Sequence, residues 1–269
     1  MSNQTKIENF STTSIRTIAL SKKVNLLELL PNVESQEIFT WVRNNQGLVA
    51  WGVKTKEEFI GKERFSRAHR WWKDFVDNCA IRDEVQTLGS GAISFVSFSY
   101  EIEDSSVVVV PQIIVGQNAE STWLTIIGNL NIEEIKNQVL NYKTEVKVPQ
   151  NLTWSDGTLS ISEWQKSVSK AVQRINNKEL DKVVLTRDLN ASSDDKIDIR
   201  HVLQNLSDSF PECWTFSVDT LIGATPELLI RRTSDQVLSR VLAGTIKRDR
   251  KSTRLNSSHL GSSYAVFCL

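Results

Sequence analysis

The stretch that decides the fold covers residues 214–246 and reads WTFSVDTLIGATPELLIRRTSDQVLSRVLAGTI. It predicts three strands, at residues 214–218, 227–232 and 239–246, separated by short turns. Strands that follow one another through short turns favour antiparallel pairing. We therefore expect an α+β fold rather than a doubly wound parallel sheet.

The sequence before residue 214 alternates between predicted strands and helices. Two strands are expected within residues 40–53, around Asn44-Asn45-Gln46-Gly47, whose Asn and Gly content suits a hairpin turn. Ser162 and Gln165 have the spacing of a capping box, which predicts a helix start. The polar stretch 143–160 should cross the surface between two halves of the chain. Further strands are expected at residues 91–100, 107–115, 122–127 and 180–189, and further helices at 56–79, 132–140 and 197–206.

Composition excludes several classes of protein. The 269 residues are 40% hydrophobic and 24% charged, as in ordinary globular proteins. Lys and Arg total 32, as do Asp and Glu, so no net field favours nucleic acid or an anionic membrane. Cys79, Cys213 and Cys268 show no CxxC spacing, which argues against a disulfide framework and a zinc site. Without a signal peptide or a long apolar run, we expect a cytoplasmic protein.

Residues 249–269 differ from the rest of the chain. They are rich in Ser and show no hydrophobic period. Back-translation of residues 249–259 and 263–269 gives codons that resemble a common short-read sequencing adapter, and Ser262 departs from it. We expect a non-native tail that packs poorly, without a buried Tyr264 or Phe267. The alternative is an ordinary polar tail.

Lys182 begins the apolar run Val183-Val184-Leu185 in a predicted strand. Alternation would place Lys182, Val184 and Thr186 on one face. Such a lysine either reaches water from a strand end or lies inside the protein. A buried lysine loses its proton more readily and can act as a base.

Glu227 follows Gly223-Ala224-Thr225-Pro226. Because Pro226 fixes a turn and has no N–H to donate, Glu227 should leave a rigid corner. It is either a solvated carboxylate or, if it faces an apolar cavity, an acid. Ala243-Gly244-Thr245 has two interpretations. Gly244 lets a ligand approach the backbone closely and Thr245 adds a hydroxyl, or the glycine only forms a turn.

Other chemistries find little support. His69 and His201 lie on predicted helices, where core or surface roles are expected. Before residue 249 there is no HExxH, GxSxG, Walker A or GxGxxG motif, which excludes zinc hydrolases, serine esterases, P-loop proteins and Rossmann domains.

Three ordered motifs resemble those of the chorismate-utilising enzymes, and most of all the isochorismate synthases. They are DKVVLTR at residues 181–187, GATPELL at 223–229 and SRVLAGTI at 239–246. The N-terminal half is similar to that subgroup too, around Arg64-Phe65, Trp71-Trp72 and Asp83-Glu84-Val85. The resemblance spans residues 40–248.

The resemblance implies a fold and a reaction. The fold is the N-terminal portion of the family's stacked, largely antiparallel sheets flanked by helices. The reaction is the Mg²⁺-dependent isomerisation of chorismate to isochorismate, by water addition at C2 and loss of the C4 hydroxyl. Lys182 would activate the water and Glu227 would protonate the departing hydroxyl. Ala243, Gly244 and Thr245 would line the substrate pocket, while the Mg²⁺ ligands belong to a C-terminal half absent from this sequence.

Residue choices separate the subgroups. Anthranilate synthases do not place a basic lysine at the position of Lys182, and aminodeoxychorismate synthases have a nucleophilic lysine in place of Ala243. Salicylate synthases share Lys182 and Glu227 and remain an alternative, as does a non-catalytic binding protein derived from the fold. We expect a polar N-terminal segment at residues 1–37, an incomplete chorismate-binding catalytic domain at 38–248 and the tail at 249–269. As written, the chain should be an inactive fragment.

Overall fold

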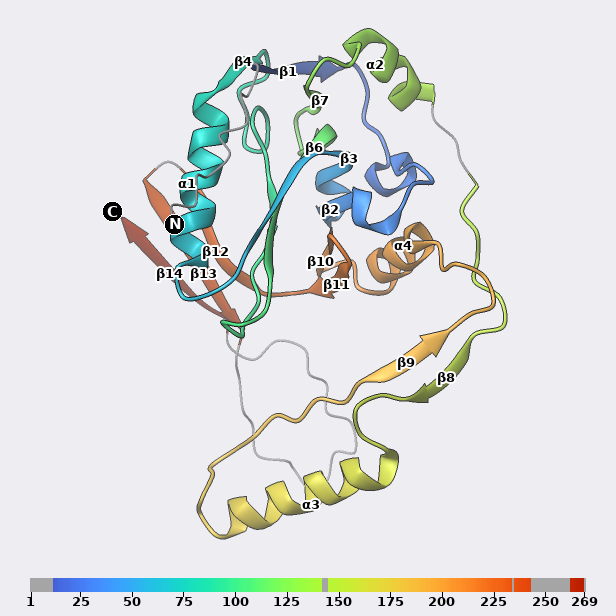
Figure 1. Cartoon of the computed structure of the whole chain (residues 1–269), viewed down its shortest axis with the longest axis vertical. Helices are drawn as coiled ribbons and strands as arrows, with labels where there is room; N and C mark the ends of the chain where they lie inside the picture. Colours follow the sequence, from blue (N-terminus) through green and yellow to red (C-terminus); the bar gives the residue numbers. More distant parts are fainter. Residues whose placement is uncertain (1–11, 142–144, 234, 243–261, 269) are drawn as a thin grey trace, which may run out of the picture. The chain divides into compact units, whose positions relative to one another are not determined.

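The computed structural model describes residues 12–141, 145–233, 235–242 and 262–268 (Figure 1). The chain forms two compact units: residues 1–145 with 199–269, and residues 146–198. The second unit contains β8 (Thr153–Asp156), α3 (Ile161–Asn176) and β9 (Leu189–Ser192). The first unit contains β1 (Thr13–Leu20), η1 (Leu26–Leu29), η2 (Ser35–Glu37), β2 (Ile38–Arg43), β3 (Gln46–Phe59), α1 (Arg64–Asp77), β4 (Cys79–Asp83), β5 (Phe95–Ser97), β6 (Ser106–Gln117), β7 (Thr122–Ile127), α2 (Ile132–Asn141), α4 (Ile199–Ser209), β10 (Trp214–Val218), β11 (Leu221–Thr225), β12 (Leu228–Thr233), β13 (Gln236–Leu242) and β14 (Ser262–Cys268).

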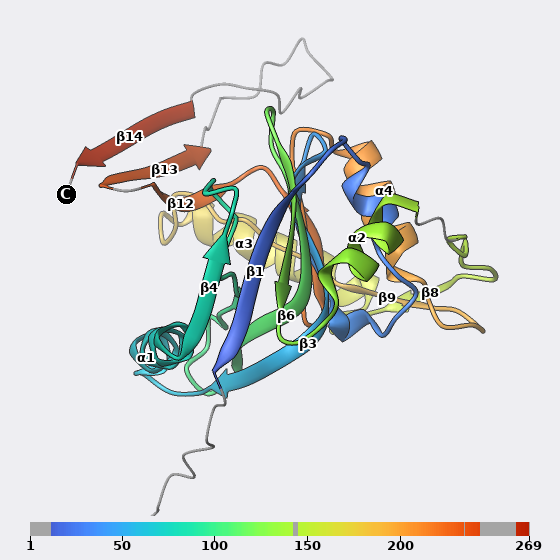
Figure 2. The same ribbon diagram turned by 90° about the horizontal axis from the view of Figure 1, so that it is seen from above.

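A nine-stranded sheet organises the first unit. Its order is β11-β10-β2-β3-β6-β7-β1-β4, and β5 also pairs with β6. All neighbours are antiparallel except β1 and β4, which run parallel and side by side (Figure 2). The expected α+β fold with largely antiparallel pairing is therefore confirmed. The Ser217 hydroxyl donates to the Ile38 carbonyl at 2.9 Å and joins β10 to β2 across 179 residues of sequence.

The hairpin between β2 and β3 confirms the predicted turn. Arg43 pairs with Gln46, and the two residues between them, Asn44 and Asn45, have φ of 51° and 53°. Both angles are positive, as a two-residue type I′ turn requires. Gly47 follows at φ 125°, where a Cβ would lie 2.0 Å from the Trp41 carbonyl oxygen, so no other residue fits there.

Helices cover both faces of the sheet (Figure 2). On one face η1, α2 and α4 supply Leu26, Val139 and Leu203 to a buried apolar cluster. On the other face Phe75 of α1 packs against buried strand residues such as Ile114. Burying these apolar side chains supplies the main driving force for folding of this unit.

Several predicted boundaries were wrong in the first unit. The sequence predicts a helix from residue 56, but β3 continues to Phe59 because β6 pairs with it there, and α1 begins at Arg64. The strand expected at 91–100 is limited to β5. The expected polar N-terminal segment, residues 1–37, contains short apolar runs in β1 and η1, which bury Ile15 and Leu26 completely. The strands β1, β4, β11 and β14 were not predicted.

The second unit departs further from expectation. The helix α3 begins two residues early, because the capping box is formed by Ser160 and Glu163 rather than Ser162 and Gln165. The strand expected at residues 180–189 is absent, and only β9 forms, paired with β8. No residue of α3 is buried.

The C-terminal tail contains regular structure. For residues 249–269 we expected poor packing without a buried Tyr264 or Phe267; here β14 pairs with β13 at the edge of a three-stranded sheet of β12, β13 and β14. The origin of residues 249–269 stays a prediction. In the described ranges, no helix is long and apolar enough to cross a membrane.

Candidate active-site residues

Lys182 lies in the second unit, in an exposed segment. Residues 182–188 form no regular secondary structure, so the predicted alternation around Lys182 is wrong. The side chain of Lys182 is exposed, and Val184 beside it is 88% exposed. Apolar residues alone do not make a strand here, because no neighbouring strand among the described residues supplies the ladder of hydrogen bonds.

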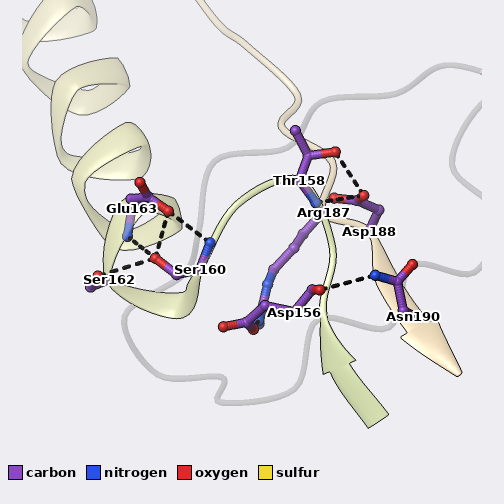
Figure 3. A network of polar contacts seen from close by, with 8 residues as sticks. All are labelled: Asp156, Thr158, Ser160, Ser162, Glu163, Arg187, Asp188 and Asn190. Carbon is purple, nitrogen blue, oxygen red and sulfur yellow. Dashed lines mark hydrogen bonds and ion pairs between the residues drawn. The ribbon is translucent and has the colours of Figure 1, made fainter.

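Polar contacts join the end of this segment, at Arg187 and Asp188, to the chain that precedes α3 (Figure 3). The Arg187 guanidinium forms an ion pair with Asp156, whose backbone carbonyl accepts a hydrogen bond from the Asn190 amide at 3.1 Å. Asp188 accepts hydrogen bonds from the backbone N–H of Thr158 at 2.8 Å and from its hydroxyl at 2.9 Å. These bonds lower the pKa of Asp188, so it stays charged at neutral pH.

Gly157 lets the two segments approach closely. A Cβ on Gly157 would lie 2.3 Å from the Asp188 carboxylate carbon. Three residues later, the Ser160 hydroxyl accepts a hydrogen bond from the Glu163 N–H, and the Glu163 carboxylate accepts one from the Ser160 N–H at 2.9 Å. Bonding to Ser160 lowers the pKa of Glu163. The chain on both sides of Gly157 therefore has a defined path up to the first turn of α3.

Glu227 lies in the first unit, at a corner between two sheets. β11 of the nine-stranded sheet ends at Thr225, and β12 of the three-stranded sheet begins at Leu228. The N–H of Glu227 donates to the Thr225 hydroxyl at 3.2 Å, and its side chain is exposed. The expected corner at Pro226 is confirmed, and the strand begins one residue later than predicted.

An aromatic cluster beside this corner was not predicted. Trp41 of β2 stacks on Trp214 of β10 with ring centroids 5.4 Å apart, and the Arg43 guanidinium lies 5.0 Å from the Trp214 ring. Trp214 pairs in turn with Thr225, two residues before Glu227. The period-2 spacing of Trp214 and Phe216 could have indicated a shared face. Its partner on β2 could not be read from the sequence.

The structure does not test how the predicted site residues lie relative to one another. Lys182 and Glu227 belong to different units, so the common concavity expected for them stays a prediction. Ala243, Gly244 and Thr245 lie outside the described residues. In the part of the chain that the structure describes, no three or more His, Cys, Asp or Glu residues gather to hold a metal ion. The described residues therefore do not form a metal site.

Curated relatives share parts of this sequence. Isochorismate synthase MenF of Bacillus subtilis (strain 168) is 31% identical over 153 residues, which cover 52% of this chain and 32% of the relative. Isochorismate synthase DhbC of the same organism is 33% identical over 97 residues, covering 32% and 24%. Isochorismate synthase EntC of Escherichia coli (strain K12) is 29% identical over 118 residues, covering 42% and 28%. The matched part thus spans about a third or less of these relatives.

Two solved structures have a similar fold. MenF, the menaquinone-specific isochorismate synthase from Escherichia coli, superposes with a TM-score of 0.55 at 17% identity, covering 89% of this chain and 57% of that one. A 2,3-dihydroxybenzoate-specific isochorismate synthase, DhbC from Bacillus anthracis, gives a TM-score of 0.54 at 19% identity, covering 83% and 53%. The family model described as "Chorismate binding enzyme" matches residues 3–261. The chain belongs to this family of chorismate-binding enzymes.

Proposed function

We propose that this protein is an isochorismate synthase, which converts chorismate to isochorismate. The observation that carries the proposal is the ordered set of motifs around Lys182, Glu227 and Gly244 in a chain of the chorismate-binding family. The three curated relatives above are named isochorismate synthases, which supports this subgroup. The proposed substrate is thus the small molecule chorismate, and no nucleic acid or membrane partner is expected.

The proposed reaction needs one base and one acid. The neutral amine of Lys182 accepts a proton from water as the water oxygen bonds to C2 of the substrate. The carboxyl group of Glu227 donates a proton to the C4 hydroxyl, which leaves as water. Return of one proton from Lys182 to Glu227 restores both groups, so atoms and charge balance.

Local structure supports parts of this assignment. The contacts of Arg187 and Asp188 fix the chain that follows Lys182, and Pro226 with the Thr225 hydroxyl fixes the chain at Glu227. Rigid supports of this kind hold reacting groups in place. We also propose that Ala243, Gly244 and Thr245 line the substrate pocket, on the resemblance alone.

Magnesium belongs to the proposal through the family resemblance. Mg²⁺ prefers carboxylate oxygens, and when bound it would hold the substrate carboxylate. Because the described residues contain no suitable group, we assign no ligand and derive no step through the ion. The proposed location is the cytoplasm, supported by cysteines without disulfide spacing. The names of the relatives are compatible with a role in menaquinone or in siderophore synthesis.

The test is an assay of the purified protein encoded by the full reading frame, with chorismate and Mg²⁺, followed by separation of the products. We expect isochorismate, and a loss of at least about 100-fold in kcat for both Lys182→Ala and Glu227→Gln. Lys170→Ala and Glu212→Gln are matched controls, since both side chains are exposed and lie outside the motifs. The controls should retain full activity.

Other results would contradict the proposal in distinct ways. Release of pyruvate with salicylate would identify a salicylate synthase. Chorismate binding without turnover would indicate a non-catalytic binding protein. Full activity of both Lys182→Ala and Glu227→Gln would remove the acid–base assignment. Reading the source DNA past codon 248 tests the adapter prediction, which requires continuous coding for an acidic C-terminal region.

A further inference from the structure

A groove between α1 and the β5 region forms a cavity of about 250 Å³. Phe65, Ala68, His69 and Trp72 line it from the helix. Their spacing of three and four residues puts them on one face of α1. The rest of the lining comes from Ser94, Val96, Phe98 and Val108. All of these residues belong to the first unit. Phe65 and Trp72 lie in the N-terminal segments that resemble the isochorismate synthases, but none of the lining residues belongs to the three motifs around Lys182, Glu227 and Gly244.

Small residues between large rings create this space. Ala68 is only 3% exposed, so its small side chain sits at the base of the groove between Phe65 and Trp72. The ring centroids of Phe65 and Phe98 lie 4.6 Å apart at a tilt of 37°, so the two rings pack against each other. Phe65 is nevertheless 54% exposed, which leaves the groove open to solvent. Aromatic walls around a slot favour a flat ring as ligand.

Three side chains that line the groove carry hydrogen-bond donors without a partner among the described residues. His69, Trp72 and Ser94 make no hydrogen bond to the part of the chain that the structure describes. In contrast, the indole N–H of Trp123 donates to the Gly89 carbonyl at 3.0 Å. An imidazole N–H, an indole N–H and a hydroxyl can all donate to one acceptor group. Such donors suit a ligand oxygen.

Basic residues are frequent on α1 but do not line the groove. The stretch from Arg64 to Lys73 contains four of them and no acidic residue. Arg64 donates to the backbone carbonyls of Gly61 and Ser99, and Lys73 forms an ion pair with Asp77. The rings and the hydrogen-bond donors of the lining therefore carry the argument, and together they favour a ligand that joins an aromatic ring to a carboxylate.

We propose that the groove between α1 and β5 is a binding site for a small ligand that combines a flat aromatic ring with a carboxylate. The ring packs against Phe65 and Phe98, and the carboxylate accepts hydrogen bonds from the side chains of His69, Trp72 and Ser94. The site does not depend on the activity proposed above.

The probe is 4-fluorobenzoate, titrated with the full chain and observed by ¹⁹F NMR. We expect saturable binding with a Kd of about 1 mM or tighter, as for a small fragment. Two reference probes separate the contributions: 4-fluorobenzyl alcohol keeps the ring without the charge, and fluoroacetate keeps the carboxylate without the ring. Both should bind at least about fivefold more weakly than 4-fluorobenzoate.

Three variants locate the site, each with a matched control. Phe65→Ala removes one aromatic side chain of the lining and should weaken binding of 4-fluorobenzoate about tenfold. Phe210→Ala is its control and should leave binding unchanged, because Phe210 is 52% exposed and Phe65 is 54% exposed. Trp72→Phe keeps a ring but removes the N–H and should weaken binding about threefold, unlike Trp154→Phe. Ser94→Leu fills the groove and should abolish binding, unlike Ser66→Leu on the exposed surface of α1.

Each other result overturns the proposal. Absence of saturable binding in a folded protein, verified by circular dichroism, removes the site. Equal affinity for 4-fluorobenzyl alcohol removes the carboxylate from the ligand class. Unchanged binding by Phe65→Ala and Ser94→Leu places the probe elsewhere. If Ser94→Leu does not fold, the pair Phe65→Ala and Phe210→Ala, both at exposed positions, decides alone.

Discussion

Two valine-rich segments of this chain have opposite environments. Val107-Val108-Val109-Val110 in β6 lies between β3 and β5, and its side chains are 0–8% exposed. Val183-Val184-Leu185 has similar composition, yet it forms no strand and is 38–88% exposed. The difference shows that a β-branched run becomes a strand only where neighbouring strands pair with it. Composition predicts the potential to pair, and the rest of the chain decides the outcome.

The largest expected effect comes from placing a charge in each segment. Val109→Asp buries a carboxylate in the sheet and should lower the free energy of unfolding by more than about 4 kcal/mol. Val184→Asp adds a charge at an exposed site and should change it by less than about 0.5 kcal/mol. Urea unfolding measures both. An equal decrease in the free energy of unfolding for both variants would show that residues 183–185 are buried in solution, which would contradict the difference between the two segments.

A smaller effect is expected at two glycines that touch large groups. A Cβ on Gly116 would lie 2.2 Å from the Trp123 ring, which is 1% exposed and has nowhere to move, so Gly116→Ala should cost about 2–3 kcal/mol. Gly157→Ala meets the exposed Asp188 carboxylate, which can rotate away, and should cost about 1 kcal/mol. Thermal unfolding of both variants tests the order, and a larger loss at Gly157 would reverse it.

The capping box of the second unit should contribute about 1 kcal/mol. Ser160→Ala removes the acceptor for the Glu163 N–H and should destabilise α3 by that amount. Ser162→Ala leaves the box intact and should change the stability by only a few tenths of a kcal/mol. Hydrogen exchange of the amides in the first turn of α3 measures the difference. Equal protection in the two variants would move the helix start back to the position predicted from sequence.

The smallest effect concerns pH and Asp83 in the first unit. Partial burial opposes its charged form, but the Ser90 hydroxyl and the N–H groups of Gln86 and Val85 together lower its pKa. A lowered pKa contributes stability above the ordinary value of about 3.9, and this contribution is lost as pH falls through the folded-state pKa.

Asp83→Asn should therefore flatten the acid side of the stability profile below about pH 4. Urea midpoints measured from pH 2 to pH 6, as about the useful range, give that slope. Asp74→Asn is the control, because Asp74 is exposed and its side chain makes no hydrogen bond to the described residues. An unchanged slope in Asp83→Asn would contradict the assigned hydrogen bonds.

Local signals in the sequence predicted local structure well. The turn at Asn44-Asn45 and the bounds of β7 and β10 follow from turn chemistry and short apolar runs. Features that depend on distant partners were missed. β3 extends to Phe59 because Ser106 pairs with it, and β1 is a strand because β7 and β4 flank it.

The candidate site follows the same rule. The corner before Glu227 was predictable, because Pro226 acts on its immediate neighbours. The environment of Lys182 was not, because a strand needs partners that residue types alone do not identify. The roles of Lys182 and Glu227 come from the family resemblance rather than from composition or spacing.

The bond between Ser217 and Ile38 has a consequence for protein synthesis. β2 cannot receive its second neighbour until the chain up to β10 has left the ribosome, 179 residues after Ile38. At about 5–20 residues per second, translation of the intervening residues takes roughly 10–35 s, during which this edge of β2 has no strand paired with it. Throughout that time β2 offers open backbone groups to any other nascent chain nearby. Yield in cells should thus depend on how fast the inserted second unit is translated, and on chaperones that hold β2 until β10 emerges.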